Sequence, residues 1–251
     1  MTRRLLEICV DDIVGVHAAI AGGADRIELC AALALGGLSP SAGLVEAALN
    51  AARPAGVAVH AMVRPRGGDF RYDEAETALA MREAFALIAQ GVDGLVFGAA
   101  RDGVLDEPVL AAWVAAVRAG GRPVSLTLHR AIDVNDDPVA AVEVAAMLGF
   151  DRILTSGGAP SAEEGVDVIA RMVARAGDRI RIMAGARVRP DNAAHLLAKT
   201  GVRELHGSAS LALAEGDARA AALGFDMPPR RRTDETMVRA LRAAIDQGVS
   251  P

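Results

Sequence analysis

The segment Gly22-Gly23-Ala24-Asp25-Arg26-Ile27 decides how this chain folds, because its pattern returns along the sequence. A glycine that ends a helix is followed within a few residues by the first apolar residues of a short strand. The pattern recurs at Gly91-Val92-Asp93-Gly94, Gly149-Phe150-Asp151-Arg152-Ile153 and Gly201-Val202-Arg203-Glu204. The cause is physical, since a helix must stop and turn back before it can feed a parallel strand. The repeat therefore predicts a series of strand–helix units.

Short apolar runs alternate with longer amphipathic runs around these turns. The predicted strands are residues 5–10, 26–30, 57–64, 94–98, 123–129, 152–155, 179–185 and 203–207. The predicted helices lie near residues 12–22, 41–52, 73–90, 106–119, 138–148, 161–176 and 190–200. Eight parallel strands with right-handed crossovers close naturally into a (β/α)8 TIM barrel, so the predicted fold class is α/β. A doubly wound open sheet is the alternative, but no G-x-G-x-x-G follows the first strand.

The chain is predicted to be one domain with a short C-terminal extension. The barrel is assigned to residues 1–209, and residues 210–251 are predicted to be a loop and helix extension of the same domain. Arg230-Arg231-Arg232 is interpreted as a solvated linker. Thr233 is a candidate N-cap for a last helix over residues 234–247.

Composition limits the classes of function. The 27 basic and 32 acidic residues are interspersed and give a net charge of −5, so nothing favours nucleic acid as a partner. No apolar stretch is long enough to span a bilayer, and the N-terminus lacks the pattern of a signal peptide. Two cysteines do not make a secreted disulfide framework. We therefore expect a cytoplasmic protein with reduced thiols and no membrane partner.

Side chains alternate along a strand, so one face of each strand meets the helices and the other faces the barrel axis. In the first predicted strand Leu6, Ile8 and Val10 share the apolar face, which should meet the helices. Barrel interiors are ordinarily filled with branched apolar side chains, whereas here the polar face would point inward. The residues predicted to face the axis include Glu7, Cys9, Arg26, Glu28, Cys30, His60, Arg64, His129, Arg181, Glu204 and His206.

Burying a charge is costly unless the charge is paired or serves a function. We therefore divide these inward-facing residues into two groups with different expected roles. Arg26, Arg181 and Glu204 occupy early strand positions and are predicted to form ion pairs that plug the barrel floor. Residues nearer the strand ends are predicted to line a pocket at the C-terminal mouth, where TIM barrels hold their active sites. Carboxylates and imidazoles can transfer protons there. The candidate catalytic residues are Glu7, Glu28, His129, Asp133 and His206.

The loops at the predicted mouth offer groups for a small anionic ligand. Arg64-Pro65-Arg66-Gly67-Gly68-Asp69 combines two guanidinium groups with glycines, which suits a carboxylate or a phosphate. Arg64 and Arg66 are predicted to be the principal charged contacts, with a solvated salt bridge to Asp69 as the alternative. The candidate substrate-binding residues are Arg64, Arg66, Asp69, Arg130, Thr155, Ser156 and Ser208.

Several strings resemble the CutC family, which is named for copper homeostasis. They include Leu6-Glu7-Ile8-Cys9-Val10-Asp11, Ala21–Cys30, Val63–Phe70, Leu128–Asp133 and Glu204-Leu205-His206, and the resemblance runs in order over residues 5–209. It implies a barrel, a cytoplasmic location and a role in copper handling, but no defined reaction. This chain departs from the family at Gly185-Ala186-Arg187, where a third glycine is usual, and at Gly207, where alanine is usual.

The residues leave copper binding and catalysis open as functions. Cu(I) prefers thiolate, thioether and imidazole, and Cys9 and Cys30 fall on adjacent strands at the same parity, which makes them the candidate metal ligands. The alternative is a lyase, isomerase or hydrolase that acts on a small anionic or phosphorylated substrate. A binding barrel without turnover is a third interpretation. The expected partner is thus a small anion or a copper ion, and the oligomeric state, including a homo-oligomer, is left open.

Overall fold

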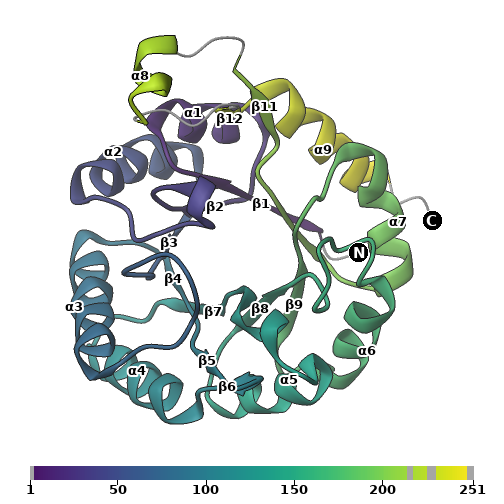
Figure 1. The fold of residues 1–251 in the computed structure, drawn as a ribbon. Helices are drawn as coiled ribbons and strands as arrows, with labels where there is room; N and C mark the ends of the chain where they lie inside the picture. The colour runs from purple at the N-terminus through teal and green to yellow at the C-terminus, as the bar shows by residue number, and fades with distance from the viewer. Residues whose placement is uncertain (1–2, 214–216, 225–229, 248–251) are drawn as a thin grey trace.

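The structure, a computed structural model, describes residues 3–213, 217–224 and 230–247, and its central sheet is a closed barrel of parallel strands (Figure 1). The strands neighbour one another in the order β1-β10-β9-β8-β7-β4-β3-β2. They are β1 Leu5–Val10, β2 Arg26–Leu29, β3 Ala58–Met62, β4 Gly94–Phe97, β7 Ser125–Leu128, β8 Arg152–Thr155, β9 Arg181–Ala184 and β10 Glu204–Gly207. The predicted (β/α)8 fold class is confirmed.

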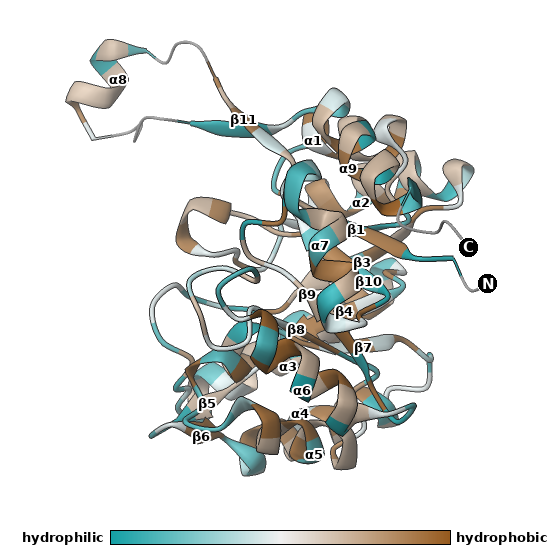
Figure 2. Cartoon of the chain, turned by 90° about the vertical axis from the view of Figure 1, so that its right-hand side faces the viewer, coloured by the Kyte–Doolittle hydropathy of each residue, from teal (hydrophilic) through white to brown (hydrophobic). Residues whose placement is uncertain are grey.

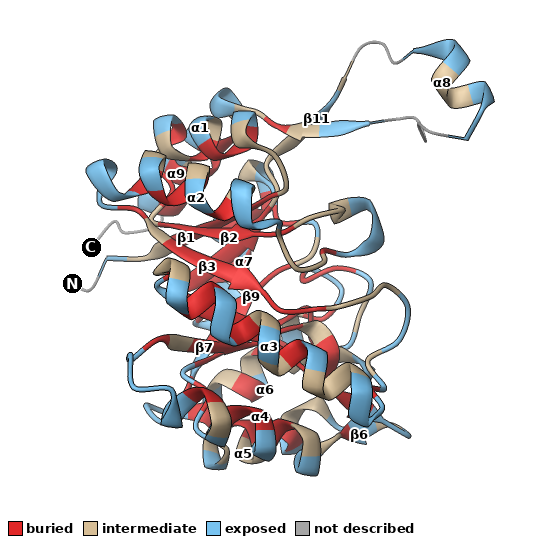
Figure 3. Ribbon diagram, turned by 90° about the vertical axis from the view of Figure 1, so that its left-hand side faces the viewer, coloured by how far each residue is buried: buried red, intermediate tan, exposed pale blue. Residues whose placement is uncertain are grey.

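Helices form a ring around this barrel (Figure 1). They are α1 Ile13–Gly22, α2 Ala42–Ala52, α3 Glu74–Gln90, α4 Glu107–Ala119, α5 Pro138–Met147, α6 Val166–Ala176, α7 Pro190–Thr200 and α9 Glu235–Gln247. Figure 3 shows the barrel strands buried and the outer faces of the helices exposed. Leu6, Ile8 and Val10 are buried in the main apolar core, as the alternation predicted. No helix within the described ranges is long and apolar enough to cross a membrane.

The aspartates in the repeated turns fix the register between neighbouring strands. Each one accepts a hydrogen bond from a backbone N–H near the start of the preceding strand and donates its own N–H to the carbonyl of the same residue. This pair of bonds satisfies backbone N–H and C=O groups at the end of the barrel where the strands begin, where pairing between strands is incomplete. The carboxylate-to-nitrogen distances are 2.8 Å for Asp25 and Leu6, 2.8 Å for Asp93 and Val59, and 2.7 Å for Asp151 and Leu126.

A buried ion-pair cluster fills the barrel axis. The Arg26 guanidinium lies between two carboxylates: its Nε donates to Glu7, and its Nη2 lies 2.8 Å from Glu204 Oε2. Arg152 Nε donates to the same Glu204 oxygen at 2.5 Å. Arg26 and Glu204 therefore pair in the barrel interior, as predicted.

The prediction that Arg181 belongs to this cluster was wrong, because its side chain is exposed. Arg181 is the first residue of β9, and it borders a hollow at the end of the barrel where the strands begin. Its register partner on β8, Arg152, is buried and bonds to Glu204 instead. Parity alone did not say which of two neighbouring arginines lies within the barrel.

The region after β10 holds more regular structure than the sequence predicted. Ser210–Ala212 (β11) pairs antiparallel with Arg231–Thr233 (β12), so most of the arginine run forms a strand rather than a linker. Together with the short helix Ala218–Ala222 (α8), β11 stands away from the barrel (Figures 2 and 3). The N-cap of α9 is Asp234 rather than Thr233, since the Asp234 carboxylate accepts from two backbone N–H groups of the first turn.

Helix α9 occupies the eighth place in the ring of helices. It packs between α1 and α7, the helices that follow the first and precede the last barrel strand. Val238, Leu241 and Ile245 form its buried stripe at helical spacing. The last helix of the extension thus covers the seam where β1 and β10 close the barrel.

Replacing Glu204 by Gln should destabilise the fold. Arg26 would keep only one carboxylate and Arg152 would keep none, and breaking a buried ion pair typically costs about 3–5 kcal/mol. We expect a decrease of that size in the free energy of unfolding, measured by urea denaturation. Glu143→Gln is the matched control, because Glu143 pairs with Arg175 and Arg179 on the surface. Equal losses in the two variants would contradict a structural role for burial of the cluster.

Candidate functional site

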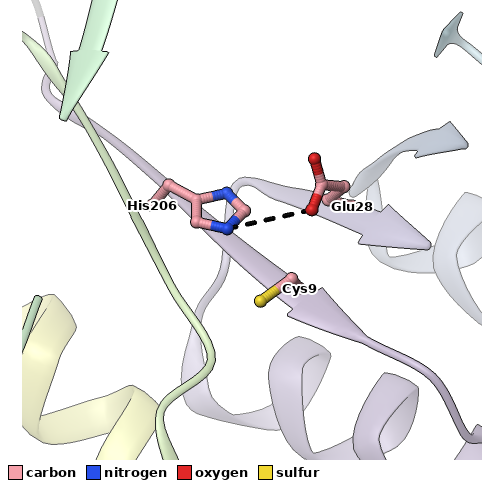
Figure 4. A group of neighbouring side chains, drawn as sticks. All are labelled: Cys9, Glu28 and His206. Carbon is pink, nitrogen blue, oxygen red and sulfur yellow. Dashed lines mark ion pairs between the residues drawn. The ribbon is translucent and has the colours of Figure 1, made fainter. Parts of the chain in front are cut away.

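Three unlike donor groups converge where β1, β2 and β10 lie side by side. Cys9 Sγ, a carboxylate oxygen of Glu28 and a ring nitrogen of His206 all lie within 4.8 Å of one another (Figure 4). Cys9 and Glu28 are register partners on neighbouring strands, which brings their side chains to the same level of the barrel. All three residues are buried and line a cavity of about 270 Å³ at the C-terminal mouth.

Glu7 orients His206 from below. His206 Nδ1 lies 2.8 Å from Glu7 Oε1, so the other ring nitrogen, Nε2, faces Glu28 Oε2 at 3.8 Å. Burial of Glu7 opposes its ionisation, but Arg26 and His206 outweigh burial and hold the pKa of Glu7 well below its usual value. A carboxylate that fixes one imidazole nitrogen and frees the other is the arrangement that supports histidine as a metal ligand or a base.

Glu28 is a carboxyl group with a raised proton affinity. Burial, opposed by His206 and reinforced by Glu7, raises its pKa from 4.5 to about 7. Its Oε1 is buried with no hydrogen-bond partner within the described ranges, and its Oε2 accepts from the Cys30 thiol at 3.6 Å. Burial, with Glu28 and Cys9 nearby, raises the pKa of Cys30 well above its usual value. Glu28 is thus able to gain or lose a proton near neutral pH.

Arg64 and His129 form the opposite wall of the cavity. Phe70 packs against both, with Arg64 Cζ 5.2 Å from its ring centroid and the His129 ring centroid 4.9 Å away. Burial, with Arg64 nearby, lowers the pKa of His129 to about 3, so its imidazole is neutral at physiological pH. Gly98 leaves room for this ring, since a Cβ there would lie 2.5 Å from His129 Nδ1.

Asp133 is engaged in organising loops beside the cavity. Its carboxylate accepts from the Thr155 hydroxyl at 2.5 Å, from the Ser156 N–H and from the Gly158 N–H. Arg130 donates to Asp133 at 2.7 Å and to the Ser156 hydroxyl at 2.8 Å. The backbone N–H groups that could hold a ligand phosphate here already hold an internal carboxylate. Of these residues only Arg130 lines the cavity.

Arg66 and Asp69 lie outside the cavity. Arg66 Nη1 is 3.0 Å from Asp69 Oδ1, and its Nε pairs with Glu76, so two carboxylates neutralise its charge. The salt bridge that was the alternative interpretation is therefore present. Ser208 does line the cavity, and its hydroxyl lies 3.0 Å from that of Ser210.

The sequence analysis did not identify Arg187 as a candidate site residue, although it lines the cavity from the loop after β9. Ala186 and Arg187 both have positive φ, at 76° and 56°. Such a conformation costs about 1–3 kcal/mol per non-glycine residue and persists only where the surroundings enforce it. Here the Ala162 N–H donates to the Ala186 carbonyl and Asn192 Nδ2 donates to the Arg187 carbonyl. The sequence held one signal for this residue: the loop reads Gly185-Ala186-Arg187 where a third glycine is usual in the family. The residue types alone gave no reason for that departure.

Comparison with known proteins places this geometry in a family. The model of the CutC family matches residues 4–211. A CutC family protein of Sinorhizobium medicae is 47% identical over 98% of this chain and 98% of its own length. One from Caulobacter vibrioides is 47% identical over 96% of this chain and 98% of its own length. The resemblance found in the sequence is thereby confirmed.

Solved structures agree on the fold. A CutC protein of Streptococcus agalactiae, named for copper homeostasis, has a TM-score of 0.76 and 29% identity over 82% of this chain and 98% of its own. Thiamine phosphate pyrophosphorylase from Pyrococcus furiosus has a TM-score of 0.60 and 14% identity over 98% of this chain and 97% of its own. At that identity the second likeness shows a shared barrel alone.

Glu28→Gln should change how stability depends on pH. The folded pKa of about 7 lies above the usual 4.5, so the proton on Glu28 stabilises the parent at low pH, and this contribution is lost as pH rises to about 7. Glutamine does not titrate, so the variant should gain stability relative to the parent between pH 5 and pH 8. Urea denaturation at both pH values measures this, with Glu46→Gln on the exposed face of α2 as the control. A constant difference between variant and parent would contradict the raised pKa.

Proposed function

The chain belongs to the CutC family, and from that premise we propose that it binds Cu(I) as cargo at the mouth of the barrel, with Cys9 Sγ and His206 Nε2 as the principal ligands. The observation that carries the proposal is the convergence of a thiol and an oriented imidazole within 4.8 Å. Thiolate and imidazole are ligands that copper favours. The name of the Streptococcus agalactiae relative points in the same direction.

Glu7 and Glu28 act on the two ligands differently. Glu7 receives the Nδ1 proton of His206, which leaves Nε2 on the side of Glu28 and available to a metal ion. Burial opposes protonation of His206, but Cys9 and Glu28 outweigh burial and raise its pKa well above the usual value. Cu(I) must therefore displace a proton from His206, so binding should release that proton.

Cys30 is the candidate third ligand. Cys30 directly follows β2, two residues beyond Glu28, and its thiol donates to the Glu28 carboxylate. The group of donors within 4.8 Å contains Cys9 but not Cys30, so the Cys30 thiol must move closer to Cys9 and His206 to reach the same ion. Both cysteines are free thiols, which suits the reducing cytoplasm that we propose for this protein.

Titration of reduced protein with Cu(I) against a chromophoric chelator tests the site. We expect one ion per chain in the parent, and loss of stoichiometric binding in Cys9→Ser and in His206→Gln. Cys30→Ser should weaken binding by about ten- to a hundredfold, the range found for residues that support a metal ligand. Full binding by Cys9→Ser would rule out this site.

Acid–base catalysis is a second candidate function, favoured by Glu28. A carboxyl group with a pKa of about 7 beside an imidazole and a thiol can move a proton to or from a small substrate. Incubation of keto acids and sugar phosphates with the protein in D2O, followed by NMR, would reveal exchange of a substrate C–H. Exchange that persists in Glu28→Gln would exclude Glu28 as the base.

A further inference from the structure

The cavity at the mouth carries positive charge that the described residues do not balance. Its lining residues include three arginines, Arg64, Arg130 and Arg187, but only one acidic residue, Glu28. Arg130 is neutralised by Asp133. Arg64 and Arg187 form no ion pair with any described residue, so two of the arginines that line the cavity lack a counter-ion among the described residues.

Arg64 is the more unusual of the two because it is only 5% exposed. Its guanidinium donates to three backbone carbonyls, at 2.9 Å to Leu35, 3.1 Å to Gly37 and 2.8 Å to Gly68, and its Nε–H has no partner among the described residues. Carbonyl dipoles hold the group in place but carry no net charge. A buried guanidinium without a carboxylate is costly unless an anion from outside supplies the missing charge.

His129 offers a neutral donor on the same wall. Its Nδ1 accepts the Ala131 N–H at 3.1 Å, which places the ring proton on Nε2. That Nε2–H is buried and has no hydrogen-bond partner in the part of the chain that the structure describes. Phe70, half-buried, packs on both Arg64 and His129 and screens them from water. A ligand that reaches these two donors must therefore displace the Phe70 ring.

Arg187 approaches from the other side of the mouth. Arg187 is exposed, and its guanidinium forms no hydrogen bond with a described residue. The left-handed backbone at Ala186 and Arg187 is held by three hydrogen bonds to its carbonyls, from Ala162, Asn192 and Arg189, which fix the loop at the rim of the cavity. A long side chain on a fixed loop opposite a buried guanidinium suits an anionic group between them.

We propose that the mouth binds a small molecule through a carboxylate or phosphate group, with Arg64, Arg187 and the His129 Nε2–H as its donors. The rest of the ligand then faces Cys9, Glu28 and His206 across the same cavity. This anion site stands on other residues than the proposed copper site and does not depend on it.

Calorimetry on metal-free protein tests the proposal with inorganic phosphate, glycerol 3-phosphate and malonate as probes. We expect at least one probe to bind the parent, and its affinity to fall about ten- to a hundredfold in Arg64→Gln and in Arg187→Gln, as for the loss of a charge-assisted hydrogen bond. The three probes also distinguish a phosphate ligand from a carboxylate ligand.

Arg66→Gln is the matched control, because Arg66 lies on the same loop as Arg64 but is neutralised by Asp69 and Glu76 outside the cavity. It should keep the parent's affinity. Arg187→Gln removes an exposed side chain and should fold like the parent, which thermal unfolding checks, so a loss there reports on binding. Unchanged affinity in Arg187→Gln, or no binding of any probe to the parent, overturns the proposal.

Discussion

The Arg26 guanidinium, held between the carboxylates of Glu7 and Glu204, is the interaction on which the interior of this barrel depends. TIM barrels commonly fill their axis with branched apolar side chains. Here charged groups take that place, and they are tolerated because each has an opposite charge within hydrogen-bond distance. Arg152 extends the pairing through Glu204 to the far side of the barrel.

This buried pairing is also what shapes the mouth above it. Because Arg26 keeps Glu7 ionised, Glu7 can hold His206 by Nδ1 and present Nε2 to Glu28. The inward alternation on β1 then places the thiol of Cys9 one step above Glu7, at the level of Glu28. The structural cluster at the floor and the chemical groups at the mouth are therefore consecutive layers of one network.

The cavity has two walls of different chemistry. Cys9, Glu28 and His206 on one wall supply a soft donor and groups that exchange protons, whereas Arg64 and His129 on the other supply a positive charge and a neutral donor, and Arg187 adds a second positive charge at the rim. Phe70 packs on Arg64 and His129 and screens both from water, which strengthens any electrostatic interaction made there. A metal ion and an anionic molecule could occupy these walls together or separately, since no residue is needed by both.

The alternation of apolar and polar residues, and the glycine turns with their aspartates, determined the (β/α)8 barrel and the inward direction of Glu7, Glu28, Arg64, His129 and His206. These features are local: a strand has a period of two, and a helix must end before a strand begins. Only the tertiary structure decided that Arg152 rather than Arg181 joins the floor cluster, that Asp133 is enclosed by Thr155 and Ser156, and that Arg66 turns outward. It also decided that Arg187 reaches the mouth. The reason is that parity gives the face of a strand, whereas barrel stagger and loop conformation decide which charges meet.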